Sequence, residues 1–306
     1  MESPANGGAP ITITSELLRG WPLPRAEDDA DVGRGKESRG RVLVAGGSLE
    51  VPGAIVLAGV AALRAGAGKL QIATCRDVAP AVAVAVPEAR VIGLPRSESG
   101  DIDPSGAARL ASAVGGVAAA LIGPGMLDIA TVHELMRRLL PQVRGTALVL
   151  DAGALSCLAD RKEALHHLDD AVVLTPHTGE LALMLGREED NITRDPLGSA
   201  RGAAAELRAI VALKGARTYV AAPDGTAYCS ADGPIGLATS GSGDTLAGVI
   251  AGLLARGAEP AQAAVWGVYL HSGAGRVMTA RMGKVGFLAR EMLAEIPALL
   301  AQFDED

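Results

Sequence analysis

Short, uninterrupted apolar runs recur along the chain and alternate with longer segments rich in Ala and Leu. Runs that are apolar at every position, rather than at every second one, are typical of strands buried on both faces of a parallel sheet. They predict strands at residues 42–45, 70–74, 90–94, 117–122, 147–150, 171–174 and 210–213.

The segments between these runs have the length and composition of helices. Two of them begin with Asp-Pro, at Asp103 and Asp195, where Asp can cap the helix and Pro occupies its first turn. Alternating strands and helices form right-handed βαβ units, so the pattern predicts an α/β/α sandwich with a mostly parallel central sheet. Helices are predicted at residues 54–65, 104–113, 131–140, 180–185 and 196–209.

The pattern changes after residue 213. Two short apolar runs, 218–222 and 226–229, flank Asp224-Gly225, which is a strong signal for a β-hairpin. Helices follow from Thr245 onward, including 261–274 and 287–300. No break in composition and no internal repeat divides the chain, so we expect one domain over residues 1–306.

The ends and the apolar runs also bear on location. Residues 1–39 are rich in Gly, Pro and charge, which predicts a flexible N-terminal arm, and they lack the order of a secretory signal. No apolar run approaches the roughly 18–20 residues that span a bilayer. We therefore expect a cytoplasmic protein with no membrane partner.

Composition narrows the function classes. The chain is 49% hydrophobic, which excludes a disordered polypeptide, yet it has only two Phe, two Trp and three Tyr. Its formal net charge is −7 (28 basic against 35 acidic residues), so it lacks both the positive charge and the stacking platforms of nucleic-acid binders. Three scattered Cys and five His show no metal-ligand spacing. The 39 glycines remain to be explained.

Three common nucleotide and hydrolase motifs are absent from the sequence. The Gly-Lys pairs at 68–69 and 283–284 are followed by Leu70 and Val285, whereas a phosphate loop needs a hydroxyl there. Gly123-Pro124-Gly125 lacks the third glycine of a dinucleotide fingerprint, since Asp128 stands at that position. The segment around Ser242 lacks the first glycine of a serine-hydrolase elbow.

The segment Gly241-Ser242-Gly243-Asp244 leads directly into an apolar helix. Glycines let successive backbone N–H groups point into one concavity, and the helix N-terminus adds partial positive charge. Such a site can stabilise a phosphoryl group in transfer, and a carboxylate at Asp244 can take a proton from a substrate hydroxyl. The alternative is that Asp244 simply caps the helix.

Similar loops follow other predicted strands. They comprise small, polar or charged residues at 46–48 with 53–54, at 123–125, at 175–180 and at 214–218. Because the carboxyl ends of parallel strands meet at one edge of a sheet, where open α/β sheets bind ligands, we expect these loops to form one site.

In their order along the chain these motifs resemble the ribokinase-like superfamily and, within it, the NAD(P)H-hydrate dehydratases. The resemblance extends from about residue 40 to residue 300. Its most specific elements are Thr-Pro-His-x-Gly-Glu at 175–180 and Lys-Gly-x-x-Thr at 214–218, supported by residues 40–48, 236–248 and 267–271. The resemblance implies a ribokinase-like α/β/α sandwich.

The resemblance also implies a reaction. In such enzymes hydrated NADH or NADPH, as the S epimer, is phosphorylated on its ring hydroxyl and then loses phosphate, with ADP as donor in bacterial members and ATP in eukaryotic ones. On this basis Asp244 would be the general base, and the backbone amides of Ser242 and Gly243 would hold the transferring phosphoryl group.

Other roles carried over from the resemblance fall into two groups. Ala54, Gly125, His177 and Asp244 would contact the hydrated dinucleotide. The adenine nucleotide would be bound by Lys214, Gly215, Ala216, Arg217 and Thr218 together with Ser242 and Gly243, with Mg²⁺ on its phosphates and no assigned protein ligand. Relatives tend to form tetramers, so a homo-oligomer is expected.

One loop departs from the family pattern. Where Asp-Ala-Asp-Ala is usual, the chain reads Asp151-Ala152-Gly153-Ala154, without the second acid. The altered loop leaves open a non-catalytic nucleotide-binding protein. A kinase of the same superfamily acting on a hydroxymethylpyrimidine, pyridoxal or thiazole alcohol also stays open, because it would use the same anion-binding turn and Asp244. The segments 46–54, 123–125 and 175–180 favour the dehydratase.

Overall fold

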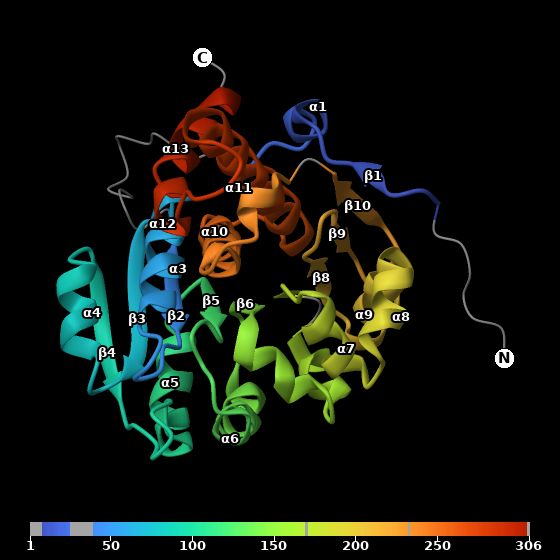
Figure 1. Cartoon of the computed structure of the whole chain (residues 1–306). Coiled ribbons are helices and arrows are strands. Elements are labelled where there is room, and N and C mark those ends of the chain that lie inside the picture. Colours follow the sequence, from blue (N-terminus) through green and yellow to red (C-terminus); the bar gives the residue numbers. More distant parts are fainter. Residues whose placement is uncertain (1–7, 25–38, 169–170, 232, 305–306) are drawn as a thin grey trace, which may run out of the picture.

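The computed structural model describes residues 8–24, 39–168, 171–231 and 233–304. Through these residues runs a ten-stranded sheet, with strand order β1-β10-β9-β8-β7-β6-β5-β2-β3-β4 (Figure 1). The strands are β1 (Ile11–Thr12), β2 (Arg41–Ala45), β3 (Lys69–Cys75), β4 (Ala89–Leu94), β5 (Ala119–Ile122), β6 (Ala147–Leu150), β7 (Val172–Leu174), β8 (Ile210–Leu213), β9 (Thr218–Ala221) and β10 (Ala227–Ser230).

The sheet is mostly parallel, as predicted. Only β9 runs against its neighbours, because the predicted hairpin joins it to β10. From β2 the chain moves outward through β3 to β4, then returns to the other side of β2 at β5 and continues through β6 and β7 to β8. The direction of winding thus reverses between β2 and β5, which is where open α/β sheets place their ligands.

Helices cover both faces of the sheet (Figure 1). The α-helices are α1 (Ser15–Arg19), α3 (Gly53–Arg64), α4 (Ala79–Ala85), α5 (Ala107–Val114), α6 (Ile129–Leu139), α7 (Thr178–Leu185), α8 (Glu189–Arg194), α9 (Pro196–Leu207), α10 (Ser242–Ala255), α11 (Pro260–Met282), α12 (Ala289–Met292) and α13 (Glu295–Leu300). Six 3₁₀ segments complete the described structure: η1 (Pro104–Gly106), η2 (Leu140–Gln142), η3 (Ala152–Leu158), η4 (Lys162–Leu168), η5 (Ile235–Leu237) and η6 (Ala301–Phe303).

Two apolar cores follow from this layering. In β2, Val42 and Val44 join the core beneath α3, α10 and α11, whereas Leu43 and Ala45 join the core beneath α5, α6 and α9. Successive side chains of a strand point to opposite faces, so a strand covered on both sides is apolar throughout. This is the physical basis of the continuous runs in the sequence.

The helix boundaries agree with the sequence signals in some places and differ in others: the helix predicted at 261–274 is α11, which continues to Met282, and the one predicted at 104–113 begins with the 3₁₀ segment η1. Asp103 and Asp195 cap their helices, accepting hydrogen bonds from the N–H groups of Ser105 (2.8 Å) and Gly198 (2.9 Å). The single helix predicted at 287–300 is instead two, α12 and α13. Pro297 lies in the first turn of α13 and cannot donate to the carbonyl four residues earlier, which ends a continuous helix.

The prediction of a flexible arm over residues 1–39 does not hold for residues 8–24. Strand β1 pairs in parallel with β10, and Leu18 of α1 is fully buried. Trp21 stacks on Tyr228, with ring centroids 5.8 Å apart. A few apolar side chains are enough to anchor a Gly- and Pro-rich segment when each packs against the rest of the fold. The rest of the predicted arm lies mostly outside the described residues.

The close packing of helix α3 against helix α10 depends on glycine. A Cβ atom added to Gly248 would lie 2.3 Å from the carbonyl oxygen of Ala58, and one added to Gly252 would lie 2.4 Å from that of Ala62. The two helices therefore meet backbone to backbone, at matching four-residue spacings. This contact fixes the start of α10 against the start of α3.

We expect Gly248→Ala to lower the free energy of unfolding by about 1–3 kcal/mol, because the added methyl group forces two packed helices apart. The thermal unfolding midpoint measures this change. Gly202→Ala is the matched control, since Gly202 lies on the exposed face of α9 with no atom within 4 Å of its Cβ position. That control should be stabilised by roughly 0.5–1 kcal/mol. Equal midpoints for the two variants would contradict the role given to the close helix contact.

Candidate active site

The candidate site lies at the carboxyl edge of the parallel strands. Five loops open there, after β2, β5, β6, β7 and β8, and the N-termini of α3, α7 and α10 face the same edge. The predicted gathering of the motif loops is therefore observed in the fold.

One group of residues lies at the switch between β2 and β5. The N–H of Gly47 donates to the carbonyl oxygen of Pro124 (2.8 Å). A Cβ atom added to Gly125 would lie 3.0 Å from the Cβ of Ala54 and 3.2 Å from the Cα of Gly47. Ala54 and Gly125, predicted to contact one ligand, are thus brought into contact with each other.

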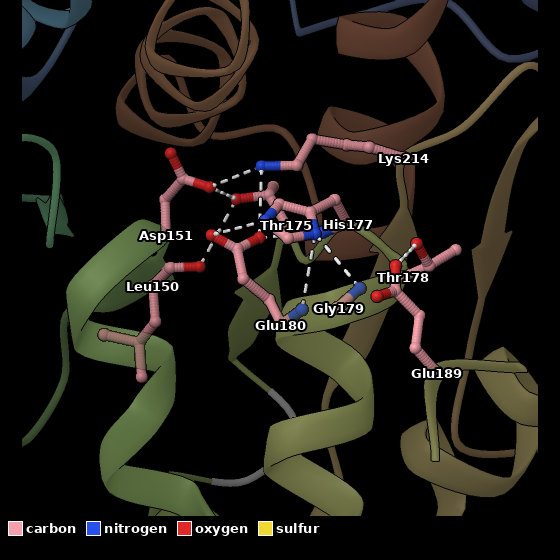
Figure 2. A network of polar contacts seen from close by, with 9 residues as sticks. All are labelled: Leu150, Asp151, Thr175, His177, Thr178, Gly179, Glu180, Glu189 and Lys214. Atoms are coloured by element: carbon pink, nitrogen blue, oxygen red, sulfur yellow. Dashed lines mark hydrogen bonds and ion pairs between the residues drawn. The ribbon is translucent and has the colours of Figure 1, made fainter. Parts of the chain in front are cut away.

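A second group forms a polar network around a lysine (Figure 2). The Nζ of Lys214 lies 2.9 Å from Oδ1 of Asp151 and 3.6 Å from Oε2 of Glu180. The hydroxyl of Thr175 donates to the same Oδ1 of Asp151 (2.7 Å). Asp151 is buried and Lys214 is mostly buried, so the ion pair is shielded from water. Burial lowers the pKa of Lys214, but the two carboxylates outweigh it and the pKa is raised.

The same lysine reaches the N-terminus of α10. A Cβ atom added to Gly243 would lie 3.3 Å from Lys214 Nζ. Lys214, which directly follows strand β8, therefore places its positive charge beside the first turn of the helix that carries Asp244. A cation beside a helix N-terminus is an arrangement suited to an anionic ligand that contacts both.

Asp244 is the third residue of α10, because the helix starts at Ser242 and its N-cap is Gly241. The alternative that Asp244 is the cap is therefore wrong. The side chain is half-buried, and burial raises its pKa to about 6, helped by the negative charges of Asp151 and Glu180 and opposed by Lys214. A carboxylate with a pKa near neutrality is well matched to general-base catalysis.

The backbone amides of this turn differ from the prediction in one respect. The N–H of Ser242 donates to the carbonyl oxygen of Thr239 (3.2 Å), so it is already used. Within the described residues, no backbone acceptor takes the N–H of Gly243 or Asp244. The first N–H groups of a helix lack partners inside the helix, and these two are the donors available to an anion.

His177 serves as the N-cap of α7. Its Nδ1 accepts hydrogen bonds from the backbone N–H groups of Gly179 (3.1 Å) and Glu180 (3.3 Å). The backbone N–H of His177 in turn donates to the Glu180 carboxylate (2.8 Å). Because Nδ1 is an acceptor, the neutral ring carries its hydrogen on Nε2. The side chain is 58% exposed, and its Nε2 lies 3.6 Å from Oε1 of Glu180.

The run from Lys214 to Thr218 does not act as one unit. Lys214 turns into the polar network, and its N–H donates to the carbonyl oxygen of Pro176 (2.8 Å). Gly215, Ala216 and Arg217 form an exposed turn, and Thr218 begins β9. The turn lies beside the network without contributing to it.

The unusual loop after β6 holds Asp151 in place. Ala152 has φ +48, a left-handed conformation that costs roughly 1–2 kcal/mol for a residue with a Cβ atom. A Cβ atom at Gly153 would lie 2.5 Å from the carbonyl oxygen of Met126, so an acidic side chain has no room there. An acidic side chain at position 153 would thus clash with the backbone, whereas Asp151, the first acid of the motif, lies beside Lys214.

The sequence motifs give no role to several residues of the site. Thr175 and Glu180 lie inside a recognised motif without a role of their own, and Asp151 is conspicuous only for its altered surroundings. His271, at the end of the 267–271 motif, contacts Ser242 from α11. A motif marks a loop, but only the fold shows which side chains of separate loops meet.

No group of three or more His, Cys, Asp or Glu side chains among the described residues could hold a metal ion. No helix there is both long and apolar enough to cross a membrane.

Comparisons with known proteins fit this geometry. The family model of NAD(P)H-hydrate dehydratase matches residues 42–298. An ADP-dependent (S)-NAD(P)H-hydrate dehydratase of Xanthomonas campestris is 48% identical, over 94% of this chain and 96% of the relative. The corresponding protein of Bacillus subtilis is 32% identical over 91% of this chain and 94% of the relative. The chain covers 53% of a bifunctional NAD(P)H-hydrate repair enzyme of Moorella thermoacetica.

Solved structures show the same fold. An ADP/ATP-dependent NAD(P)H-hydrate dehydratase of B. subtilis, co-crystallised with ATP and Mg²⁺, aligns with a TM-score of 0.80 and 31% identity, covering 96% of this chain and 99% of that one. A ribokinase-like superfamily protein of Enterococcus faecalis aligns with a TM-score of 0.81 and 25% identity over 98% and 99% of the two chains. A hydroxyethylthiazole kinase of Pyrococcus horikoshii, at 18% identity, shares the fold alone. The chain belongs to the NAD(P)H-hydrate dehydratase family, with a ribokinase-like fold.

Proposed function

We propose that this chain is an ADP-dependent (S)-NAD(P)H-hydrate dehydratase in which Asp244 is the general base. The observation that carries the proposal is the position of this carboxylate. It lies in the first turn of α10, beside the free N–H groups of Gly243 and Asp244 and within the field of Lys214. A base, an anion-binding turn and a cation are the groups that phosphoryl transfer to an alcohol requires.

In the first step Asp244 accepts the proton of the ring hydroxyl as the hydroxyl oxygen attacks the terminal phosphorus of the nucleotide. The bond between that phosphorus and its bridging oxygen breaks, and the shortened nucleotide leaves. The two free amides and Lys214 stabilise the charge on the transferring phosphoryl oxygens. The hydrated dinucleotide would approach from the side of Ala54, Gly125 and His177, with His177 Nε2–H as a donor.

In the second step the phosphorylated ring expels phosphate. The lone pair of the ring nitrogen forms a double bond to the carbon that carried the phosphate, the C–O bond breaks, and loss of a proton from the neighbouring carbon restores the dihydropyridine. Phosphate is a far better leaving group than hydroxide, so no strong acid is needed. The lysine and helix N-terminus that held the phosphoryl group also suit the departing phosphate.

The nucleotide would lie over the turn between β8 and β9. Arg217 on this exposed turn and Lys214 beneath it supply positive charge for the phosphates, and Gly215, Ala216 and Thr218 supply backbone and hydroxyl contacts. Mg²⁺ is held by phosphate oxygens and water when it has few protein ligands. The carboxylates of Asp151 and Glu180 face Lys214, so we assign neither of them to Mg²⁺.

Three further parts of the proposal concern the assembly, the place of action and the phosphoryl donor. From the family resemblance we infer a homotetramer, and ADP as the donor with ATP as the alternative. The cytoplasm is the place of action that the sequence predicts.

The principal test is the variant Asp244→Asn. We expect kcat for recovery of NADH from its hydrate, with ADP and Mg²⁺, to fall by a factor of about 10² or more, because the base is lost. Return of the reduced-nicotinamide absorbance measures the rate, and calorimetry measures ADP binding. Affinity for ADP should stay within a few-fold of the parent. The thermal midpoint should not fall, since a raised carboxyl pKa means that folding disfavours the charge.

Asp190→Asn is the matched control, an equal change on the exposed helix α8 that should leave the rate unaltered. An Asp244→Asn enzyme with the parent rate would overturn the assignment of the base. Stable phosphorylation of an alcohol, without return of NADH, would overturn the dehydratase and favour a kinase.

The pH profile provides a second prediction. Asp244 must be ionised to accept a proton, so kcat/KM should be level above its pKa of about 6 and fall about tenfold per pH unit below it. Rates are measured at several pH values together with ADP affinity, because nucleotide phosphates also titrate in this range. A profile that stays level at least one unit below the stated pKa, with ADP affinity unchanged, would contradict a base of raised pKa.

A further inference from the structure

A buried histidine lies behind the first turn of α10. His271 belongs to α11, and only 9% of the residue is exposed. Its Nε2 lies 2.9 Å from the hydroxyl oxygen of Ser242 and 3.1 Å from the carbonyl oxygen of the same residue. The histidine therefore contacts the helix that carries Asp244, two residues before that carboxylate.

These two distances determine which nitrogen carries the hydrogen. A carbonyl oxygen can only accept, so the short contact requires Nε2 to be the donor. Burial, reinforced by the charge of Lys214, lowers the pKa of His271 to about 4 despite the bond to Ser242, so the ring is neutral at physiological pH. The neutral ring then has its hydrogen on Nε2 and none on Nδ1.

Ser242 is consequently held at three atoms. Its N–H donates to the carbonyl oxygen of Thr239, and its carbonyl and hydroxyl oxygens both face the Nε2–H of His271. The preceding and following residues, Gly241 and Gly243, have no side chain with which to fix the turn. His271 is thus a buried side chain of another helix that holds the glycine-rich turn, together with Thr245 of α10, whose hydroxyl donates to the carbonyl oxygen of Gly241 (3.1 Å).

We propose that His271 is a positioning residue for the reaction, which orients the free N–H groups of Gly243 and Asp244 through its hydrogen bonds to Ser242. The inference rests on the proposed function, because it assigns those N–H groups to the transferring phosphoryl group. Amide donors stabilise a transition state only when they are already aimed at the developing charge. The two glycines of the turn have no side chains to supply that aim, so it comes from hydrogen bonds such as those of His271 to Ser242 and of Thr245 to Gly241.

The test compares two replacements of similar size. In His271→Gln the side-chain amide nitrogen reaches the position of Nε2 and can still donate, whereas in His271→Leu no donor remains. We expect kcat to fall about 10- to 100-fold in His271→Leu, part of the effect of losing an oxyanion donor outright. KM for ADP should change less than about threefold, since Lys214 still holds the nucleotide. His271→Gln should regain most of kcat.

A control separates this effect from general loss of packing. His166→Leu removes an imidazole that contacts the carbonyl oxygen of Glu206 (3.1 Å) away from the site, and should leave kcat unchanged. Thermal midpoints are measured for all variants. If His271→Leu retains the parent kcat, or if His271→Gln is as slow as His271→Leu while both remain folded, the proposal is overturned.

Nitrogen-15 NMR of the parent enzyme tests the same point without any variant. The ring nitrogens of His271 should give the chemical shifts of a neutral imidazole protonated on Nε2. Shifts of a ring protonated on Nδ1 would overturn the assignment. This readout does not depend on turnover. If the parent enzyme returns no NADH at all, the proposed function fails while the tautomer remains measurable.

Discussion

The buried ion pair between Asp151 and Lys214 organises the site. Two charges removed from water carry a large desolvation cost, which is offset only when each has good partners. Here Asp151 also accepts a hydrogen bond from Thr175, and Lys214 lies between two carboxylates, at 2.9 and 3.6 Å. Three loops, after β6, β7 and β8, are tied together by this one arrangement (Figure 2).

The pair also sets the chemistry of Asp244. Burial raises the pKa of Asp244, and the negative charges of Asp151 and Glu180, which share the lysine, raise it further, while the lysine charge lowers it only in part. The outcome is a carboxylate with a pKa of about 6 in the first turn of a helix, as the proposed base requires. An uncompensated lysine in the same place would make Asp244 a weaker base. In the proposed function the network both binds phosphate and tunes the base.

The sequence allowed the strands of the sheet to be predicted because buried parallel strands are apolar throughout. Residues 147–150 and 210–213 coincide with β6 and β8. The missed elements include β1, which has two residues and pairs with β10, and α4, a seven-residue helix whose sequence APAVAVA is apolar throughout and does not distinguish a helix from a strand. Tertiary contacts, rather than local preference, create such elements.

The site was predictable in its loops and not in its network. Gly-rich and charged segments after strands marked where ligands bind, and Asp244 stood out at the start of an apolar helix. The contact of Asp151 with Lys214 joins residues 63 positions apart, and the bond between Ser242 and His271 joins residues 29 apart. Distances of that kind follow from strand order and helix packing, which no local pattern contains.

The most direct test of this account is the acid limb of the kcat/KM profile in the variant Asp151→Asn. The substitution removes one negative charge near Asp244 and leaves Lys214 freer to stabilise the ionised base, and both changes lower the pKa of Asp244. The account predicts that the limb moves to lower pH than in the parent enzyme. A limb that stays in place, or moves to higher pH, would contradict the claim that the buried pair sets the base.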